Sequence, residues 1–392
     1  FAEAHNNLGN MLKELGRLEE AEARYKQALE LKPNSAEALM LLGIKAMAVG
    51  CLEDAEARFK QSLQLNPNSS GAHLKLGNIL LQSARLGEAE ASFRSAIALQ
   101  PEDHIAHNSL GRTLRSLGRF GEAEVSFRQA VVLKPDYAVG KDSLLYCLYI
   151  QDKPSAFFDQ LDYFILQDHV SAVMGSLTER SAIKYGSKRP NLFCETPLEY
   201  VSHTDLNAQC DFAEIFIEPI RNILNEKKIA GRTQSLLVNG YQSFGNLFTY
   251  SDLTEKIEKF IRLELEKYRI NFKSCEEGLI EKWPTEYILN GWLISMKSGG
   301  ELLPHIHGAG WISGSVYINV PSKLKSDSGA LVVSPAEAQD ERATRRNIEK
   351  TIDVATGSLV FFPSSLTHYT IPFESKEERI VLAFDMVPSR KT

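Results

Sequence analysis

Four residue types recur along the first third of the chain at a constant interval of 34 residues. They follow one another in the order glycine, alanine, aromatic residue and proline. The positions are Gly9, Gly43, Gly77 and Gly111; Ala21, Ala55, Ala89 and Ala123; Tyr25, Phe59, Phe93 and Phe127; and Pro33, Pro67, Pro101 and Pro135. A fixed period of this length predicts an array of equivalent structural units, each of which packs only against its neighbours.

Each unit consists of two amphipathic segments separated by a short break, as in LGRTLRSLGRFGEAEVSFRQAVVLKP. The glycine and the alanine allow two helices to approach closely, the aromatic residue fills the space between helix pairs, and the proline ends the second helix. The breaks are expected at Gly16, Gly50, Ala84 and Gly118. Residues 137–150 predict one more helix that caps the array.

The period and the order of small, aromatic and proline residues resemble the tetratricopeptide repeat, over four units from Ala2 to Pro135. The resemblance implies a right-handed solenoid whose concave face, lined by the first helix of each pair, binds a protein or peptide. An array that only holds subunits or domains together is the alternative. Some arrays of this family carry an asparagine just before the LG pair of each repeat. Because the positions concerned hold Asn7, Leu41, Lys75 and Ser109, we expect any partner to be recognised by a mixed surface.

The composition argues against several classes of protein. Of the 392 residues 43% are hydrophobic and 24% charged, and the net charge is −6, so no general basic character indicates nucleic acid or an anionic membrane as a partner. No apolar run approaches the ~20 residues that span a bilayer. The five cysteines are scattered without a C-x-x-C pair, which fits reduced thiols and a cytoplasmic location. Since the chain begins at Phe1, inside a repeat, we expect it to be a fragment that leaves room for upstream repeats or a targeting segment.

The hydrophobic pattern changes after the array. Residues 151–206 combine a helical stretch with a polar loop, and two further helices are predicted at 208–229, where Pro219 interrupts the pattern, and at 253–272. Beyond Tyr287 the period becomes two, in short runs such as GSLVFFPSS and RIVLAFDMVP, which predicts an antiparallel sandwich or barrel. We therefore expect three parts: a repeat array at 1–150, a helical and loop linker at 151–206, and a β-rich domain at 207–392.

Two histidines one residue apart precede the strand-like segment WISGSVYIN, in LLPHIHGAGWISGSVYINVP. On a strand, residues i and i+2 point to the same face roughly 6.5–7 Å apart, so His305 and His307 could share one metal ion. A third histidine, His368, follows GSLVFFPSSLT, and Arg379 comes eleven residues later. Each of these residues alone is more often a surface or hydrogen-bonded side chain. Their order together predicts a metal site with a cation close by.

The C-terminal part of the chain resembles the 2-oxoglutarate–iron(II) oxygenase family. The matching segments, between about residues 235 and 388, are NGWLISMKSGGELLPHIHGAGWISGSVYINVP, SGALVVSP and GSLVFFPSSLTHYTIPFESKEERIVLAFD. The resemblance implies a double-stranded β-helix in which His305, His307 and His368 hold Fe(II) and leave positions for a bidentate co-substrate and dioxygen. It also implies that Arg379 pairs with the distal carboxylate of 2-oxoglutarate and that Tyr317 touches the same co-substrate.

Two positions depart from the family pattern. His307 stands where the usual ligand is a carboxylate, so either a neutral third ligand leaves more positive charge on the metal, or His307 stands beside the metal without binding it. Val381 stands two residues after the arginine, where Ser or Thr is frequent, so one hydrogen bond to the co-substrate is expected to be missing. Trp292 and Trp311 are expected near the mouth of the barrel, in packing roles.

Two alternative functions remain open at this point. A metal-dependent cupin that needs no 2-oxoglutarate would match Gly299 and the two histidines, and then Gly357, Pro363 and His368. The glutamate that a cupin carries a few residues after His307 is absent, and a cupin has no use for the arginine, so the oxygenase is the preferred hypothesis. The other alternative is a non-catalytic interaction scaffold whose oxygenase domain is degenerate.

We therefore expect an α+β multidomain protein, in which an all-α tetratricopeptide solenoid is joined to a double-stranded β-helix, or jelly roll, with flanking helices. The resemblance implies a 2-oxoglutarate- and Fe(II)-dependent dioxygenase that hydroxylates a protein or peptide recruited by the array. The charged loop from Glu337 to Lys350, with Arg342, Arg345 and Arg346, is expected to form either a lid or substrate contact, or a solvated loop. The substrate itself cannot be derived from the sequence, because a fold determines chemistry better than specificity.

Overall fold

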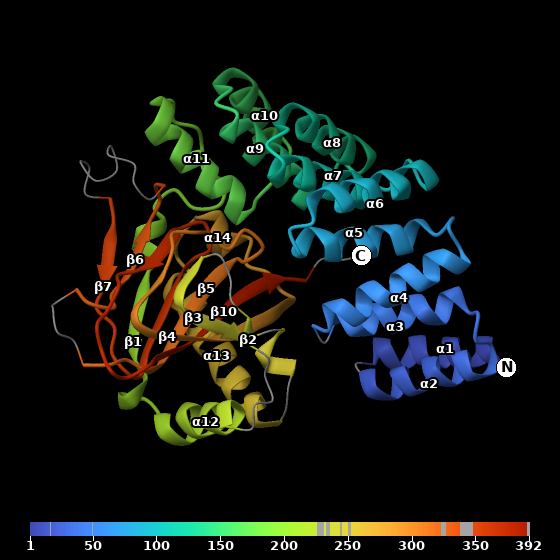
Figure 1. Ribbon diagram of the computed structural model, residues 1–392. Helices are drawn as coiled ribbons and strands as arrows, with labels where there is room; N and C mark the ends of the chain where they lie inside the picture. The colour runs from blue at the N-terminus through green and yellow to red at the C-terminus, as the bar shows by residue number, and fades with distance from the viewer. Residues whose placement is uncertain are drawn as a thin grey trace. The chain divides into compact units, whose positions relative to one another are not determined.

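The computed structural model describes residues 1–15, 17–48, 50–225, 231–232, 236–243, 245–249, 252–322, 327–337 and 348–389. The chain divides into two compact units, Phe1–Lys153 and Pro154–Thr392 (Figure 1). The expected three-part division, with a separate linker at 151–206, stays a prediction. Most of the expected lid, including Arg342, Arg345 and Arg346, lies outside the described residues.

The first unit is a run of consecutive helices, as the 34-residue period predicts. Helices α1 to α8 form four successive pairs, and α9 packs against α7 and α8 (Figure 1). The bounds are α1 Ala2–Glu14, α2 Leu18–Leu31, α3 Ala36–Ala48, α4 Leu52–Leu65, α5 Ser70–Gln82, α6 Leu86–Leu99, α7 His104–Ser116, α8 Phe120–Leu133 and α9 Ala138–Ile150. The expectation of an all-α repeat array is confirmed, whereas the capping role given to residues 137–150 stays a prediction.

The recurring small residues are required by the packing within each pair. A Cβ atom added to Gly111 would lie 2.6 Å from Cε1 of Phe127, closer than two carbon atoms approach. The breaks between paired helices need a left-handed backbone, with φ of +80° at Gly50 and +75° at Gly118. Ala84 adopts the same conformation with φ of 56°, although its Cβ disfavours it. The third repeat is therefore strained at its turn.

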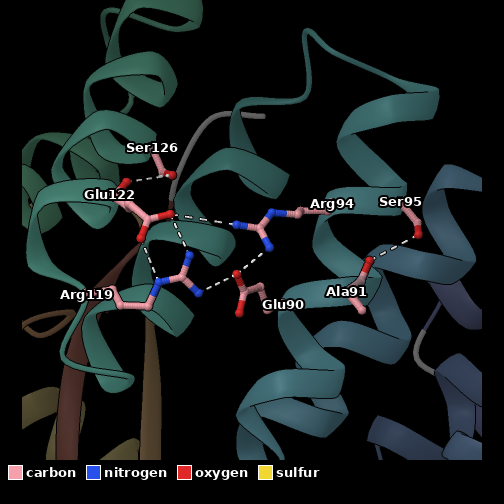
Figure 2. A network of polar contacts seen from close by, with 7 residues as sticks. All are labelled: Glu90, Ala91, Arg94, Ser95, Arg119, Glu122 and Ser126. Carbon is pink, nitrogen blue, oxygen red and sulfur yellow. Dashed lines mark hydrogen bonds and ion pairs between the residues drawn. The ribbon is translucent and has the colours of Figure 1, made fainter.

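An ion pair joins neighbouring repeats at positions that also recur every 34 residues. Arg119 donates from Nη1 to Oε1 of Glu90 in the preceding repeat, at 2.6 Å, and binds Glu122 of its own helix (Figure 2). The equivalent contacts elsewhere are Glu56 with Arg85 and Glu124 with Lys153. The basic partners are 37–49% exposed, whereas the glutamates are 11–18% exposed. The regular spacing of these pairs makes them markers of the register between repeats.

The second unit begins with helices and continues into strands. Its helical elements are α10 Pro154–Leu166, α11 Ala172–Tyr185, η1 Pro197–Tyr200, η2 Leu206–Ala208, η3 Ala213–Ile217, α12 Glu218–Asn225, η4 Leu247–Thr249, α13 Asp252–Asn271 and α14 Gly278–Glu281. Its strands are β1 Ser202–Asp205, β2 Gly231–Arg232, β3 Leu237–Ser243, β4 Tyr287–Leu302, β5 Ile312–Asn319, β6 Leu331–Ser334, β7 Lys350–Ile352, β8 Ser358–Pro363, β9 Thr367–Thr370 and β10 Arg379–Pro388.

The strands form two antiparallel sheets, in the manner of a jelly roll. The larger sheet has the order β1-β8-β5-β10-β4-β3-β2, and the smaller has the order β7-β6-β9. The predicted antiparallel fold is therefore confirmed. One local expectation was wrong. Residues 202–205, expected in a loop, form β1 at the edge of the larger sheet, paired with β8. The interruption expected at Pro219 is present, because the π-helix η3 ends at Ile217 and α12 begins at Glu218, with Pro219 in its first turn.

The larger sheet has one face against helices and one face toward the smaller sheet. Along β10, Leu382 and Phe384 pack with Phe216 of η3 and Ile261 of α13 in one apolar core. The alternate residues, which include Arg379, face a cavity between the two sheets. The period of two along β10 therefore separates the residues that hold the fold together from those that line the cavity.

Two features concern the whole chain. All five cysteines are free thiols. Among the residues described by the structure, no helix is both long enough and apolar enough to cross a membrane. The cytoplasmic location stays a prediction.

Candidate active site

Three histidines from two separate segments meet at the end of the cavity. His305 and His307 lie in the connection between β4 and β5, and not within a strand as the sequence suggested. His305 joins His368, at the second position of β9, through an isolated β-bridge, with backbone N–O distances of 3.2 and 2.9 Å. The Nε2 atoms of His305 and His307 lie 3.0 Å apart. One potential ligand atom from each of the three imidazoles lies within 4.8 Å of the others.

The partners of the Nδ1 atoms determine the tautomers of these histidines. His305 Nδ1 lies 2.8 Å from the carbonyl oxygen of Leu303, and His307 Nδ1 lies 2.7 Å from Oδ1 of Asp385. Carbonyl and carboxylate oxygens only accept, so both Nδ1 atoms carry the proton and both Nε2 atoms present a lone pair. Two lone pairs 3.0 Å apart repel one another unless a proton or a metal ion lies between them. The arrangement therefore fits a cation, and the Nδ1 contacts orient the rings for it.

A short chain of hydrogen bonds holds Asp385 behind His307. The Ser313 hydroxyl donates to Oδ1 of Asp385 at 2.7 Å and lies 2.8 Å from the hydroxyl of Ser364. A Cβ atom added to Gly310 would lie 2.5 Å from Oγ of Ser364. A glycine at this position therefore leaves space for the Ser364 hydroxyl and its hydrogen bond. A carboxylate is thus present near the three histidines, but it accepts a hydrogen bond from Nδ1 of His307.

The burial of the histidines favours the neutral form that binds metals. Burial lowers the pKa of His305 to about 4, and the neighbouring His307 contributes in the same direction. Burial also lowers the pKa of His368 well below its ordinary value, because this side chain is 5% exposed and lies beside Phe362, with ring centroids 4.9 Å apart. At neutral pH both imidazoles are therefore unprotonated, and a metal ion needs to displace no proton from them.

Arg379 begins β10 and is 1% exposed. Its Nη1 atom donates to the carbonyl oxygen of Gly329, its guanidinium lies 5.1 Å from the ring centroid of Tyr317, and its Nε atom has no partner. In the part of the chain that the structure describes, no carboxylate pairs with it. Burial lowers the pKa of Arg379 and raises the pKa of the Tyr317 hydroxyl. A buried cation without an anion is costly, so the site favours a negatively charged ligand.

A cavity of about 220 Å³ contains the three histidines, Tyr317 and Arg379 together. Its floor includes a row of residues in register across four strands, in which Gln242 of β3, Ile294 of β4, Val381 of β10 and Tyr317 of β5 pair in turn. Gln242 is 8% exposed, and its side-chain amide makes no hydrogen bond to another described residue. It therefore supplies unpaired polar atoms beside Val381, where the sequence indicated that a polar residue was missing.

The two tryptophans have different positions. Trp292 lines the cavity and makes an edge contact with His307, with ring centroids 5.3 Å apart. Trp311 packs on Phe193 in the core and donates from Nε1 to the carbonyl oxygen of Leu279, at 2.8 Å. Only Trp292 is therefore placed to contact a ligand of the cavity.

Sequence analysis missed Asp385 and Gln242. The position of Asp385 could have been predicted from the sequence, because it lies six residues after Arg379 and a period of two places both on the same face of β10. The position of Gln242 could not be predicted from the sequence, because it depends on the pairing of β3 with β4. The same holds for Ser313, which lines the cavity and whose hydroxyl donates to Asp385 and lies 3.3 Å from Nδ1 of His307.

Family models match both regions of the chain. Residues 290–385 match the model described as "Putative 2OG-Fe(II) oxygenase", and models of the tetratricopeptide repeat match residues 9–44, 42–103 and 74–138. No curated protein matches the chain. The matched segments include all three histidines, Tyr317, Arg379 and Asp385 in the oxygenase region.

Solved structures with similar repeats are distant in sequence. MamA is 24% identical, with 40% of this chain and 90% of that chain covered and a TM-score of 0.36. PilF of Pseudomonas aeruginosa is 20% identical, with coverages of 47% and 84% and a TM-score of 0.43. YrrB, described as a tetratricopeptide repeat protein with an unusual peptide-binding site, is 23% identical, with coverages of 40% and 81% and a TM-score of 0.37. The chain thus combines tetratricopeptide repeats in its N-terminal region with a C-terminal domain of the 2OG-Fe(II) oxygenase type.

Proposed function

We propose that the C-terminal domain is a 2-oxoglutarate- and Fe(II)-dependent dioxygenase that hydroxylates a protein or peptide recruited by the repeat array. One observation carries the proposal. A single cavity contains three imidazoles whose potential ligand atoms lie within 4.8 Å of one another, and a buried arginine that pairs with no carboxylate of the described residues. The first feature suits a metal ion and the second suits a carboxylate, and few ligand sets need both.

His305, His307 and His368 are the residues that would hold the metal. Their neutral imidazoles suit Fe(II), and a set of three leaves room for other ligands on the same ion. Fe(II) bound there would couple the oxidative decarboxylation of 2-oxoglutarate by dioxygen to the hydroxylation of a C–H bond. The chain itself orients the rings of His305 and His307 through Leu303 and Asp385, and burial keeps the imidazoles of His305 and His368 unprotonated.

Arg379 and Tyr317 would hold the far carboxylate of 2-oxoglutarate. The guanidinium is buried and has Nε free to donate, and the Tyr317 side chain lies against it. The charges then balance, because the metal and Arg379 bring three positive charges, while the co-substrate and Asp385 bring three negative ones. Asp385 thus supplies the negative charge that the usual carboxylate ligand would bring. The imidazole of His307 separates this charge from the metal ion.

The proposal has two rivals. A cupin-like metalloenzyme would use the histidines without 2-oxoglutarate, and a non-catalytic scaffold would use neither. The position of Arg379 inside the histidine cavity favours the oxygenase, since neither rival has a reason to bury an arginine without an anion there. The substrate class rests on the tetratricopeptide repeats, which suit peptide binding.

Anaerobic titration of the full chain with Fe(II) and then 2-oxoglutarate tests this function. We expect the weak visible charge-transfer band of the chelate in wild type and in Arg262→Ala, a half-buried control arginine that is paired with Glu258 and does not line the cavity. The band should disappear in His305→Ala, and in Arg379→Ala it should need far more 2-oxoglutarate. Metal binding without a band in wild type would support the cupin-like rival, and no metal binding would support the scaffold.

Turnover is tested separately from binding. Release of succinate and consumption of dioxygen by the loaded wild type, above the level in His305→Ala, are expected even without the true substrate, because these enzymes oxidise 2-oxoglutarate slowly alone. A band without any turnover, with or without candidate peptides, would indicate a binding domain that has lost catalysis.

A further inference from the structure

One side of helix α11 contacts both segments that carry the three histidines. A Cβ atom added to Gly308, which follows the first two histidines, would lie 2.6 Å from Cγ2 of Val173. Arg180 donates from Nη2 to Oγ1 of Thr367, which precedes the third histidine, at 2.8 Å. Val173 and Arg180 are seven residues apart on α11, so they point to the same side of the helix, about 10 Å from one another. The helix therefore joins two segments that are distant in the sequence.

The same side of α11 also reaches the strand that pairs with β9. Ile183, three residues after Arg180, is 7% exposed and packs with Ala336, just beyond the end of β6. All four residues of β6 pair with β9 in the smaller sheet. Helix α11 lies within residues 151–206, where the sequence predicted a linker. Its contacts make it a support for the strand that carries His368.

The hydrogen bond between Arg180 and Thr367 is buried. Arg180 is 9% exposed and Thr367 is 2% exposed. The other partner of the guanidinium is Glu337, whose Oε1 lies 3.4 Å from Nη1 and whose side chain is 50% exposed. A hydrogen bond from a charged donor in a buried place contributes more to stability than an exposed ion pair. The contact with Thr367 is therefore the one that fixes the guanidinium.

This hydrogen bond acts on His368 through the backbone of β9. Neighbouring residues of a strand point to opposite faces, so Thr367 is turned toward α11 while His368 lines the cavity. The backbone of His368 is bridged to His305 on its other edge. A strand that is held at Thr367 from outside consequently keeps the imidazole of His368 at a constant position relative to the other two.

We propose that α11 positions the three histidines for a metal ion, through Thr367 on one segment and through Gly308 on the other. Arg180 and Val173 are positioning residues, because neither of them lines the cavity. This role rests on the proposed function in that the histidines bind a metal ion. It requires neither 2-oxoglutarate nor turnover.

The charge of Arg180 separates positioning from a purely electrostatic effect. A cation close to a metal ion repels it, so loss of the charge alone would strengthen metal binding. Loss of a positioning contact has the opposite sign, because the imidazoles then meet the metal ion in a less favourable arrangement. The substitution Thr367→Val removes the contact and leaves the charge in place.

Titration of the chelator-treated full chain with Co(II), followed by visible absorption, tests the proposal. Co(II) accepts imidazole ligands, and the intensity of its bands reports the geometry of coordination. We expect Arg180→Met and Thr367→Val each to weaken Co(II) binding about three- to tenfold and to change the band intensity, since both act one step behind a ligand. The double variant should bind no more weakly than the weaker single variant, because the two residues share one hydrogen bond.

Two matched variants control for the loss of a buried hydroxyl and of an ion pair. Thr178→Val removes a buried hydroxyl that donates to the carbonyl oxygen of Met174 within α11 itself, at 2.8 Å. Glu337→Gln removes the ion pair with Arg180 and leaves the contact with Thr367. Both variants should bind Co(II) as wild type does, with the same band intensity.

The contact of Val173 with Gly308 has a test of its own. Gly308→Ala should weaken Co(II) binding, because the added Cβ atom meets Cγ2 of Val173 and displaces the turn after His307. Val173→Ala removes that Cγ2 atom. The double variant Gly308→Ala/Val173→Ala should therefore recover most of the wild-type affinity, which an unspecific loss of stability would not do.

The proposal is overturned if wild type binds no Co(II), if R180M binds Co(II) as tightly as wild type or more tightly, if T178V or E337Q weakens binding as much as T367V, or if Val173→Ala fails to rescue Gly308→Ala. Co(II) binding with these effects, but without the charge-transfer band of Fe(II) and 2-oxoglutarate, would contradict the oxygenase and support the role of α11. The band in wild type together with unchanged Co(II) affinities in the variants would do the reverse.

Discussion

The carboxylate of Asp385 accepts a hydrogen bond from Nδ1 of His307 at 2.7 Å, on the side of the ring opposite to the other histidines. The contact holds His307 in the tautomer whose Nε2 atom carries the lone pair. It also brings a negative charge to a site whose expected ligands are all neutral. In the proposed metal site, this carboxylate compensates through an imidazole for the absence of the usual carboxylate ligand.

Replacement of Asp385 by asparagine is expected to weaken Fe(II) binding by about 10–100-fold, because the amide removes the charge and can stabilise the wrong tautomer. The measurement is competition with a coloured chelator under anaerobic conditions. Ser313→Ala is the matched control, since it removes one hydrogen bond to Asp385 but leaves the carboxylate, and its effect should be smaller. Equal affinities in wild type and D385N would contradict the role given to Asp385.

The stability of the metal-free protein is expected to fall as the solution becomes acidic. In the unfolded chain His305 takes up a proton near pH 6.5, whereas burial lowers its pKa to about 4 in the folded protein. The unfolded state therefore binds more protons between these values, and the free energy of unfolding decreases as the pH falls from about 6.5 to about 4. His368 acts in the same direction. Urea denaturation of chelator-treated protein across this range should show a shallower pH dependence in His305→Gln than in wild type; parallel curves would refute it.

Gln242 is expected to contribute to co-substrate binding. Its unpaired amide lies in the cavity in register with Val381, so a leucine of similar size should raise the KM for 2-oxoglutarate about 5–10-fold, the effect of one lost hydrogen bond. Fe(II) affinity should not change. The control is Gln209→Leu, an exposed glutamine outside this cavity. An unchanged KM in Q242L would show that the amide does not reach the co-substrate.

The strained turn of the third repeat gives a test of the array. Ala84 has φ of 56° where the equivalent residues of two other repeats are glycines, so Ala84→Gly is expected to increase the free energy of unfolding of the array by about 0.5 kcal/mol. Urea denaturation followed by circular dichroism measures the change. Ala91→Gly, in the middle of α6, should do the reverse, because glycine destabilises a helix interior by about 1 kcal/mol. A loss of stability in both variants would contradict the assigned strain.

The array could be predicted almost completely from the sequence, since its contacts join residues that are close along the chain and recur every 34 residues. The pairing of Gly111 with Phe127 is an example, because both belong to one repeat. The two faces of β10 could also be predicted, because alternation along a strand is a local property. The order of the three histidines and Arg379 along the chain predicted a metal site with a cation close by, and a family resemblance added Tyr317. The structure brings all five residues to one cavity.

The sequence by itself determined the residue types and the periodic elements, whereas only the tertiary structure decided which strands lie side by side. The bridge between His305 and His368, the contact of Asp385 with His307 and the register of Gln242 with Val381 all depend on that choice. Residues 202–205 form a strand because they pair with β8, a contact between segments far apart in the chain. Strand pairing joins segments far apart in the chain, and its energy comes from partners that no local pattern specifies.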